Sequence, residues 1–152
     1  MEREENVLLG ENIIERYDYE QTKNNLLDLI DYYFVYELEF HYISPPMITP
    51  SYEIRYDSNK EFTRDSKVEK YVISKITIEE DIIAFYNDLY TIYKRLNIDE
   101  LKYFKQCYLK KKPEYIVMYE MNLNRRSFDK IKKSCVIKIA LYFGIAIRKV
   151  NW

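Results

Sequence analysis

A run of charged residues near the C-terminus holds the side chains of this chain that could do chemistry. Residues 125–133 read Arg-Arg-Ser-Phe-Asp-Lys-Ile-Lys-Lys. Guanidinium and ammonium groups bind nucleic-acid phosphates, and an arginine can also read a guanine through its O6 and N7 atoms. On a helix of 3.6 residues per turn, Arg126 and Lys130 lie opposite an apolar face that contains Phe128 and Ile131. The pattern predicts a helix that packs on one side and binds double-stranded DNA on the other.

The candidate DNA contacts fall into two sets. Side chains on the exposed face can reach base edges, where Asp129 would accept a hydrogen bond from a cytosine amino group or orient an arginine. The predicted base-reading residues are Arg126, Ser127, Asp129 and Lys130. Other cations would hold phosphates and set the register without carrying sequence information. The predicted phosphate contacts are Lys110, Lys111, Lys112, Arg125, Lys132 and Lys133.

The two arginines of the run break a local rule of helix formation. Arg125 and Arg126 would occupy the first helical turn, where the positive end of the helix dipole makes each cation unfavourable by about 0.3–1 kcal/mol. A bound phosphate or a guanine edge would reverse the sign of that cost. Because residues that break a local rule often serve a site, the arginines favour a DNA-binding helix over a packing helix with a solvated side.

The charges of the whole chain are segregated, although the net charge is only −1. Residues 1–101 hold 22 acidic and 11 basic residues, whereas residues 102–152 hold 3 acidic and 13 basic ones. An AT-rich genome would explain why many of the basic residues are lysine, but not why the basic residues gather in the last third of the chain. The segregation is typical of a polyanion-binding end attached to an acidic body.

Several classes of enzyme and metalloprotein are excluded by composition. With 2 glycines, neither a P-loop nor a Rossmann fingerprint can be written. The single histidine, His41, and the separated Cys107 and Cys135 leave a zinc site almost without ligands. We therefore expect no enzymatic activity, no cofactor and no metal.

Targeting signals are also missing from the sequence. No stretch approaches the roughly 18 apolar residues of a membrane span. The chain starts Met-Glu-Arg-Glu-Glu, which is too polar for a signal peptide. We expect a cytoplasmic protein of the bacterial host cell that does not contact a membrane.

Apolar periodicity predicts an all-α protein whose N-terminal long helices are joined by an extended linker to a C-terminal helix-turn-helix. A short helix around Ile13 precedes a long one over residues 18–40, capped by Asp18. Prolines indicate the linker over residues 44–65. The predicted divisions are an N-terminal helical segment (1–43), the linker (44–65), a central helix (66–97) and the DNA-binding domain (98–152).

The central helical region is either one long helix or two helices that meet near Thr77. Capping boxes start at Ser66 and again at Thr77. A helix of this length needs a partner along an apolar stripe, either the first helix or a second subunit. The predicted stripe is Val68, Val72, Ile76, Ile82 or Ile83, Tyr86, Leu89 or Tyr90, Tyr93 and Leu96.

The last third reads as three short helices. Asp99 is the predicted N-cap of the first, and Pro113 starts the second, which ends at Met121. Asn122 follows where a left-handed residue is expected, because Asn tolerates that conformation. Asn124 can cap the third helix, which runs from Arg125 to about Phe143 and is closed by Gly144. Two helices joined by a tight turn, the second rich in Arg and Lys, make a helix-turn-helix.

The third helix is apolar on more than one face in its C-terminal half, which must therefore be covered. Either the tail, residues 145–152, folds back as a short extended cover, or a second subunit contacts this surface. The sequence leaves both alternatives open.

The residues of the turn resemble a known family. The pattern Val117-Met118-x-x-Met121-Asn122-Leu123-Asn124-x-x-Ser127-Phe128 is similar to the helix-turn-helix of sigma factor region four. In that family a small residue commonly fills the position of Met118 and a glycine fills that of Asn122. The resemblance implies promoter-type recognition of double-stranded DNA.

The wider chain resembles the phage late-gene transcriptional activators of the ArpU/RinA type. The resembling segments are the Tyr-rich first helix, Ile48-Thr49-Pro50-Ser51-Tyr52, Val68-Glu69-Lys70 and, most specifically, residues 125–133. The resemblance implies activation of the packaging, morphogenesis and lysis genes of a prophage.

The expected partner is promoter or operator DNA. RNA polymerase could bind the acidic N-terminal half, and bacterial helix-turn-helix proteins often act as homodimers. Two alternative functions stay open. One is a DNA-packaging adaptor similar to a small terminase subunit, and the other is a protein-interaction module that acts on RNA polymerase without touching DNA.

Overall fold

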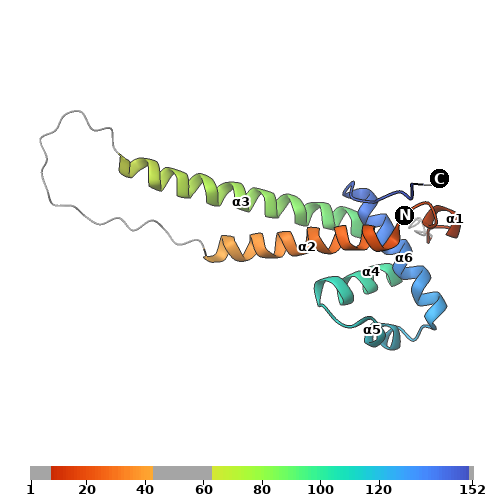
Figure 1. Cartoon of the computed structure of the whole chain (residues 1–152). Coiled ribbons are helices and arrows are strands. Elements are labelled where there is room, and N and C mark those ends of the chain that lie inside the picture. Colours follow the sequence, from red (N-terminus) through yellow and green to blue (C-terminus); the bar gives the residue numbers. More distant parts are fainter. Residues whose placement is uncertain (1–7, 43–62, 151–152) are drawn as a thin grey trace, which may run out of the picture. The chain divides into compact units, whose positions relative to one another are not determined.

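The computed structural model describes residues 8–42 and 63–150, and these residues are largely helical (Figure 1). The elements are α1 (Glu11–Ile14), α2 (Tyr19–Tyr42), α3 (Thr63–Tyr93), α4 (Ile98–Phe104), a π-helical turn η1 (Lys105–Leu109), α5 (Glu114–Glu120) and α6 (Arg125–Tyr142). The described residues contain no strand, only an isolated antiparallel bridge between Tyr17 and Arg148. The prediction of an all-α fold is confirmed.

The described residues divide into two compact units. The first unit joins residues 8–32 to residues 87–150, and the second consists of residues 33–42 and 63–86. The unit that carries the basic residues therefore differs from the predicted domain of residues 98–152, because the start of α2 belongs to it. The side chain of Asn25 donates to the carbonyl oxygen of Ile145 at 3.1 Å, and the hydroxyl of Thr22 accepts from the amide of Ile147.

Packing of α6 against α4 forms the centre of the first unit (Figure 1). The apolar face of α6 that was predicted through Phe128 and Ile131 is buried. It continues at the buried Cys135 and Ile139, whereas Tyr142 at the end of the helix is partly exposed. A second α6 face is buried as well, at Val136, Ile137 and Ala140. The opposing core residues are Tyr103, Phe104, Tyr108 and Val117.

The tail after α6 folds back in extended form, which was one of the two alternatives left open by the sequence. Gly144 has a φ of 71°, in the left-handed region where glycine ends helices without strain. Beyond it, the amide of Asp18 donates to the carbonyl oxygen of Ile147 at 2.8 Å. The tail therefore covers the start of α2 within the same chain.

The helix starts follow local capping signals, with corrections at α5 and α4. Pro113 is the extended N-cap of α5 rather than its first residue. As predicted, the Asp18 carboxylate accepts from an amide in the first turn of α2, that of Gln21. At α4 the N-cap is Asn97 rather than the predicted Asp99, because Asn97 is extended and its side chain accepts from the amide of Glu100 at 2.7 Å. Asp99 instead lies in the first turn, where its negative charge interacts favourably with the positive end of the helix dipole.

The central region forms one continuous helix, α3, which confirms the first of the two alternatives left open by the sequence and excludes a break near Thr77. The predicted capping boxes at Ser66 and Thr77 both fall inside it. The hydroxyl of Thr77 donates to the carbonyl oxygen of Ile73, as threonines within helices do. Residues 63–65 of the predicted linker are helical, and residues 44–62 lie outside the described part.

In the second unit α2 and α3 pack through aromatic residues. The rings of Tyr33 and Phe85 are stacked with their centroids 3.9 Å apart, and the hydroxyl of Tyr86 donates to Glu37 at 2.8 Å. The predicted stripe of α3 is wrong in its first half, since Val68, Val72 and Ile76 are exposed, and wrong again at Tyr86. Among the side chains of α3 that the structure describes, those of Ile78, Phe85, Leu89 and Ile92 are buried.

Candidate nucleic-acid interface

The turn before α6 orients the candidate DNA-binding helix. Asn122 has a φ of 54°, as its place after α5 predicts. The side chain of Asn124 then caps α6 by accepting from the amide of Ser127 at 2.8 Å, which confirms the predicted cap and start of the helix. Ser127 itself lies half-buried in the first turn of α6.

The N-terminal half of α6 has one face in the core and one in solvent. The ring of Phe128 is buried against that of Tyr103, with the centroids 5.4 Å apart. On the other side, Arg125, Arg126, Lys130 and Lys133 are exposed. We call these four residues the cationic face.

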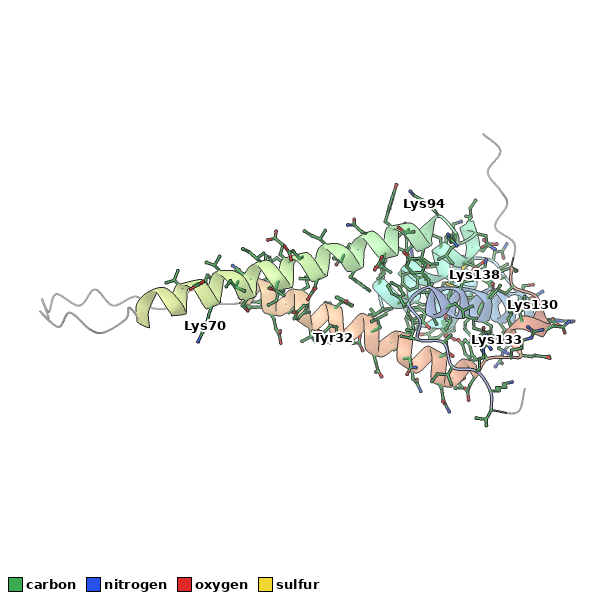
Figure 2. The ribbon with its side chains drawn as sticks, turned by 90° about the horizontal axis from the view of Figure 1, so that it is seen from above. Tyr32, Lys70, Lys94, Lys130, Lys133 and Lys138 are labelled. Carbon is green, nitrogen blue, oxygen red and sulfur yellow. The ribbon has the colours of Figure 1, made fainter. Side chains whose placement is uncertain are left out.

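The cationic face borders an open cleft of about 520 Å³ between α6 and α1. All four of its residues line this cleft together with Asp129, and Figure 2 shows Lys130 and Lys133 next to α1. The structure therefore brings together three of the four predicted base-reading residues and two of the six predicted phosphate contacts. Ser127 is not part of the cleft lining.

Two of the predicted base-reading residues already have partners of opposite charge. The Nζ atom of Lys130 lies 3.1 Å from Oε1 of Glu11. Asp129 lies 3.6 Å from Lys132 rather than orienting an arginine. Arg126 is exposed and has no ion-pair partner in the described part of the chain, so its guanidinium can reach a ligand unhindered.

Lys132 does not suit the phosphate contact that the sequence predicts for it. Its Nζ atom lies 3.2 Å from Glu114 of α5 and 5.7 Å from the centre of the Tyr19 ring, and its side chain is only 17% exposed. Position 132 lies on the side of α6 that faces α5 and α2, so the ammonium group of Lys132 binds side chains of these helices. The neighbouring Lys133 points into solvent instead.

The three lysines after η1 do not line the cleft. Lys111 pairs with Asp31 at 2.9 Å, and Lys112 pairs with Glu120 at 3.2 Å. Lys110 is exposed. Lys110–Lys112 therefore lie apart from the cationic face. Two of them pair with acidic side chains, and Lys110 has no ion pair among the described residues.

No sequence pattern predicted that acidic residues face α6. Glu11 and Glu15 line the same cleft as the cationic face. No local pattern points to this proximity, because α1 and α6 are more than a hundred residues apart in the chain. The only available signal was the opposite charge of the two segments.

Several ionisable groups of this unit are wholly or partly buried. Burial raises the pKa of the Cys107 thiol to about 11 and that of Cys135 well above its ordinary value, so neither thiol is an activated nucleophile. The phenols of Tyr19, Tyr103 and Tyr108 are likewise buried, and this raises their pKa values. Groups of three or more metal-ligating side chains do not occur among the described residues.

No helix in the described part of the chain is long and apolar enough to cross a membrane. Comparisons of the chain with protein-family models, with curated proteins and with solved structures gave no match.

Proposed function

We propose that this protein is a sequence-specific double-stranded DNA-binding regulator of transcription that reads DNA with the N-terminal half of α6. The observation that carries the proposal is the cationic face. Its four cations are exposed on one side of a helix whose other side is fixed in the core. Such a helix is rigid enough to present side chains to a major groove in a defined register.

The roles within the cationic face follow from position. Arg126 is exposed and has no described ion-pair partner, and it reads a base, with guanine O6 and N7 as its preferred acceptors. Arg125 and Lys133 hold phosphates on either side of the groove. Lys130 reaches a second base or phosphate once its carboxylate partner gives way. A phosphate near Arg125 and Arg126 also removes the unfavourable dipole interaction of these first-turn cations.

The regulated genes are proposed from the resemblance of the sequence to phage late-gene activators. In this proposal the protein activates packaging, morphogenesis and lysis genes, and its acidic N-terminal half contacts RNA polymerase. The charge distribution supports this proposal. Residues 1–101 carry twice as many acidic as basic residues and are therefore repelled by DNA.

Binding to DNA is tested by selecting a preferred duplex from a random pool with the full-length protein. Affinity for the labelled duplex is then measured by fluorescence anisotropy. Arg126→Ala should weaken binding by about 1–3 kcal/mol and relax the preference at one position of the site. Lys70→Ala removes a charge from an exposed position on α3 in the second unit and should leave the affinity unchanged.

The outcomes separate the alternatives. A loss that is equal for all duplexes makes Arg126 a phosphate contact rather than a base reader. Failure of the wild-type protein to bind any duplex at low salt would overturn the proposal and favour a module that acts on RNA polymerase alone. Electron microscopy that shows a ring-shaped oligomer would favour a packaging adaptor.

A further inference from the structure

We infer that α1 is an acidic competitor of DNA, built into the chain and held beside the cationic face of α6 in the free protein. The inference rests on the proposed function, because it assigns a regulatory contact to the same surface. Glu11 and Glu15 line the cleft together with the cationic face, and Glu11 pairs with Lys130 at 3.1 Å. The Glu11 carboxylate therefore binds the ammonium group that a DNA phosphate would otherwise bind.

Hydrogen bonds on both sides hold α1 in this position. Before the helix, the amide of Leu9 donates to the hydroxyl of Ser134 at 2.9 Å, and Ser134 is fully buried. After the helix, the amide of Lys149 donates to the carbonyl oxygen of Arg16 at 3.0 Å, next to the bridge between Tyr17 and Arg148. None of these bonds involves the carboxylates of Glu11 or Glu15. The location of α1 is therefore set by its backbone, and the acidic side chains are free to act on α6.

The contact is weak enough to be displaced. The side chains of Lys130 and Glu11 are 46% and 66% exposed, and ion pairs at such exposure contribute little to stability. A duplex that offers several phosphates to the cationic face outcompetes one carboxylate, and its negative charge repels both glutamates. Binding of DNA at Lys130 and the ion pair between Lys130 and Glu11 thus exclude each other. The ion pair lowers the affinity of the free protein for DNA.

The test is the variant Glu11→Gln/Glu15→Gln, which removes both charges and keeps the size of the side chains. Binding of the selected duplex should tighten by about two- to fivefold at about 0.1 M salt, because Lys130 no longer has a competing carboxylate. The matched control is Glu79→Gln/Glu80→Gln, which changes the net charge equally at two exposed positions of α3. Its affinity should rise much less.

A second measurement follows α1 directly. The amide of Leu9 should exchange with solvent slowly in the free protein, because it is bonded to the buried Ser134. Saturating duplex should leave this exchange slow, because a phosphate replaces the Glu11 carboxylate at Lys130 while the backbone bonds of the segment persist.

The outcomes distinguish this inference from the proposed function. If wild type and variant bind the duplex with equal affinity, the protein is a DNA-binding protein but α1 does not compete with DNA. An equal gain in the control variant assigns the effect to net charge and overturns the inference. Faster exchange at Leu9 on DNA binding would show that the duplex displaces the whole segment, and it would overturn the inference that the carboxylates compete from a fixed α1. If neither protein binds any duplex, the proposed function fails and this inference fails with it.

Discussion

The ammonium group of Lys138 lies 2.9 Å from Oε1 of Glu100, between the two helices that form the centre of the first unit. The side chain of Glu100 is fully buried and that of Lys138 is 14% exposed. The second carboxylate oxygen, Oε2, has no hydrogen-bond partner among the described residues. Burial of an incompletely bonded carboxylate is unfavourable, so Glu100 depends on its one cation.

Removal of that cation should destabilise the fold. We expect Lys138→Met to lower the free energy of unfolding at pH 7 by about 3–5 kcal/mol, because a buried carboxylate is left unpaired. The free energy is measured by urea unfolding followed by circular dichroism. Lys102→Met, at an exposed position of α4, should change it by less than about 0.5 kcal/mol. The double variant Glu100→Leu/Lys138→Met should recover most of the loss, and a single variant as stable as wild type would contradict the prediction.

The same carboxylate should make stability depend on pH. Burial raises the pKa of Glu100 above its ordinary value of 4.5, although Lys138 opposes the shift. The folded state therefore keeps this proton at a pH where the unfolded state has lost it, and stability falls as pH rises through the interval above 4.5. Relative to Glu100→Gln, wild type should lose about 1.4 kcal/mol for each unit of pKa shift. Urea unfolding of both proteins between about pH 4 and 7 measures this difference, and a constant difference would refute it.

Lys132 and Lys133 are neighbours in sequence that should differ in DNA binding. Lys133 belongs to the cationic face, whereas Lys132 is held by Glu114 and is mostly buried. Lys133→Met should reduce the slope of log affinity against log salt by about 0.9, the value for one lost phosphate contact. Lys132→Met should leave the slope unchanged. Anisotropy titrations at several salt concentrations measure both, and equal effects of the two substitutions would show that the distinction is wrong.

The turn before α6 depends on the left-handed conformation of Asn122. Its φ of 54° is unfavourable for residues with a Cβ atom, although Asn tolerates it better than most. Asn122→Ala should destabilise the protein by about 1 kcal/mol, and Asn122→Gly should be neutral or stabilising. Thermal unfolding provides the measurement. Since Asn87 is exposed in a regular part of α3, Asn87→Ala is the control and should have no such cost. Similar effects of Ala and Gly at position 122 would be evidence against strain there.

Signals between close neighbours in sequence were sufficient for the last helix. Asn122, Asn124 and Gly144 mark its turn, its start and its end, because each acts on backbone groups within a few residues. The apolar face through Phe128 and Cys135 was equally readable from the helical period. The exposure of Arg126 on the opposite side follows from the same periodicity.

Choices between equivalent surfaces were not readable in the same way. The helix α3 has two apolar stripes, and the sequence favours the one through Val72 and Ile76, whereas the structure buries the one through Ile78 and Phe85. Periodicity places residues on a face but does not say which face meets a partner. For the same reason Lys132 was predicted to contact phosphate although α5 provides Glu114 as its partner.

The amino-acid sequence by itself determined the all-α class, the bounds of α6 and the presence of a cationic side on it, because helical period and capping are local properties. Only the tertiary structure decided what lies against that side. Glu11 meets Lys130 because the tail after α6 folds back onto the chain around Tyr17, and this contact spans more than a hundred residues. Coulomb attraction depends on distance in space, and that distance is set by the packing of the whole unit rather than by position in the chain.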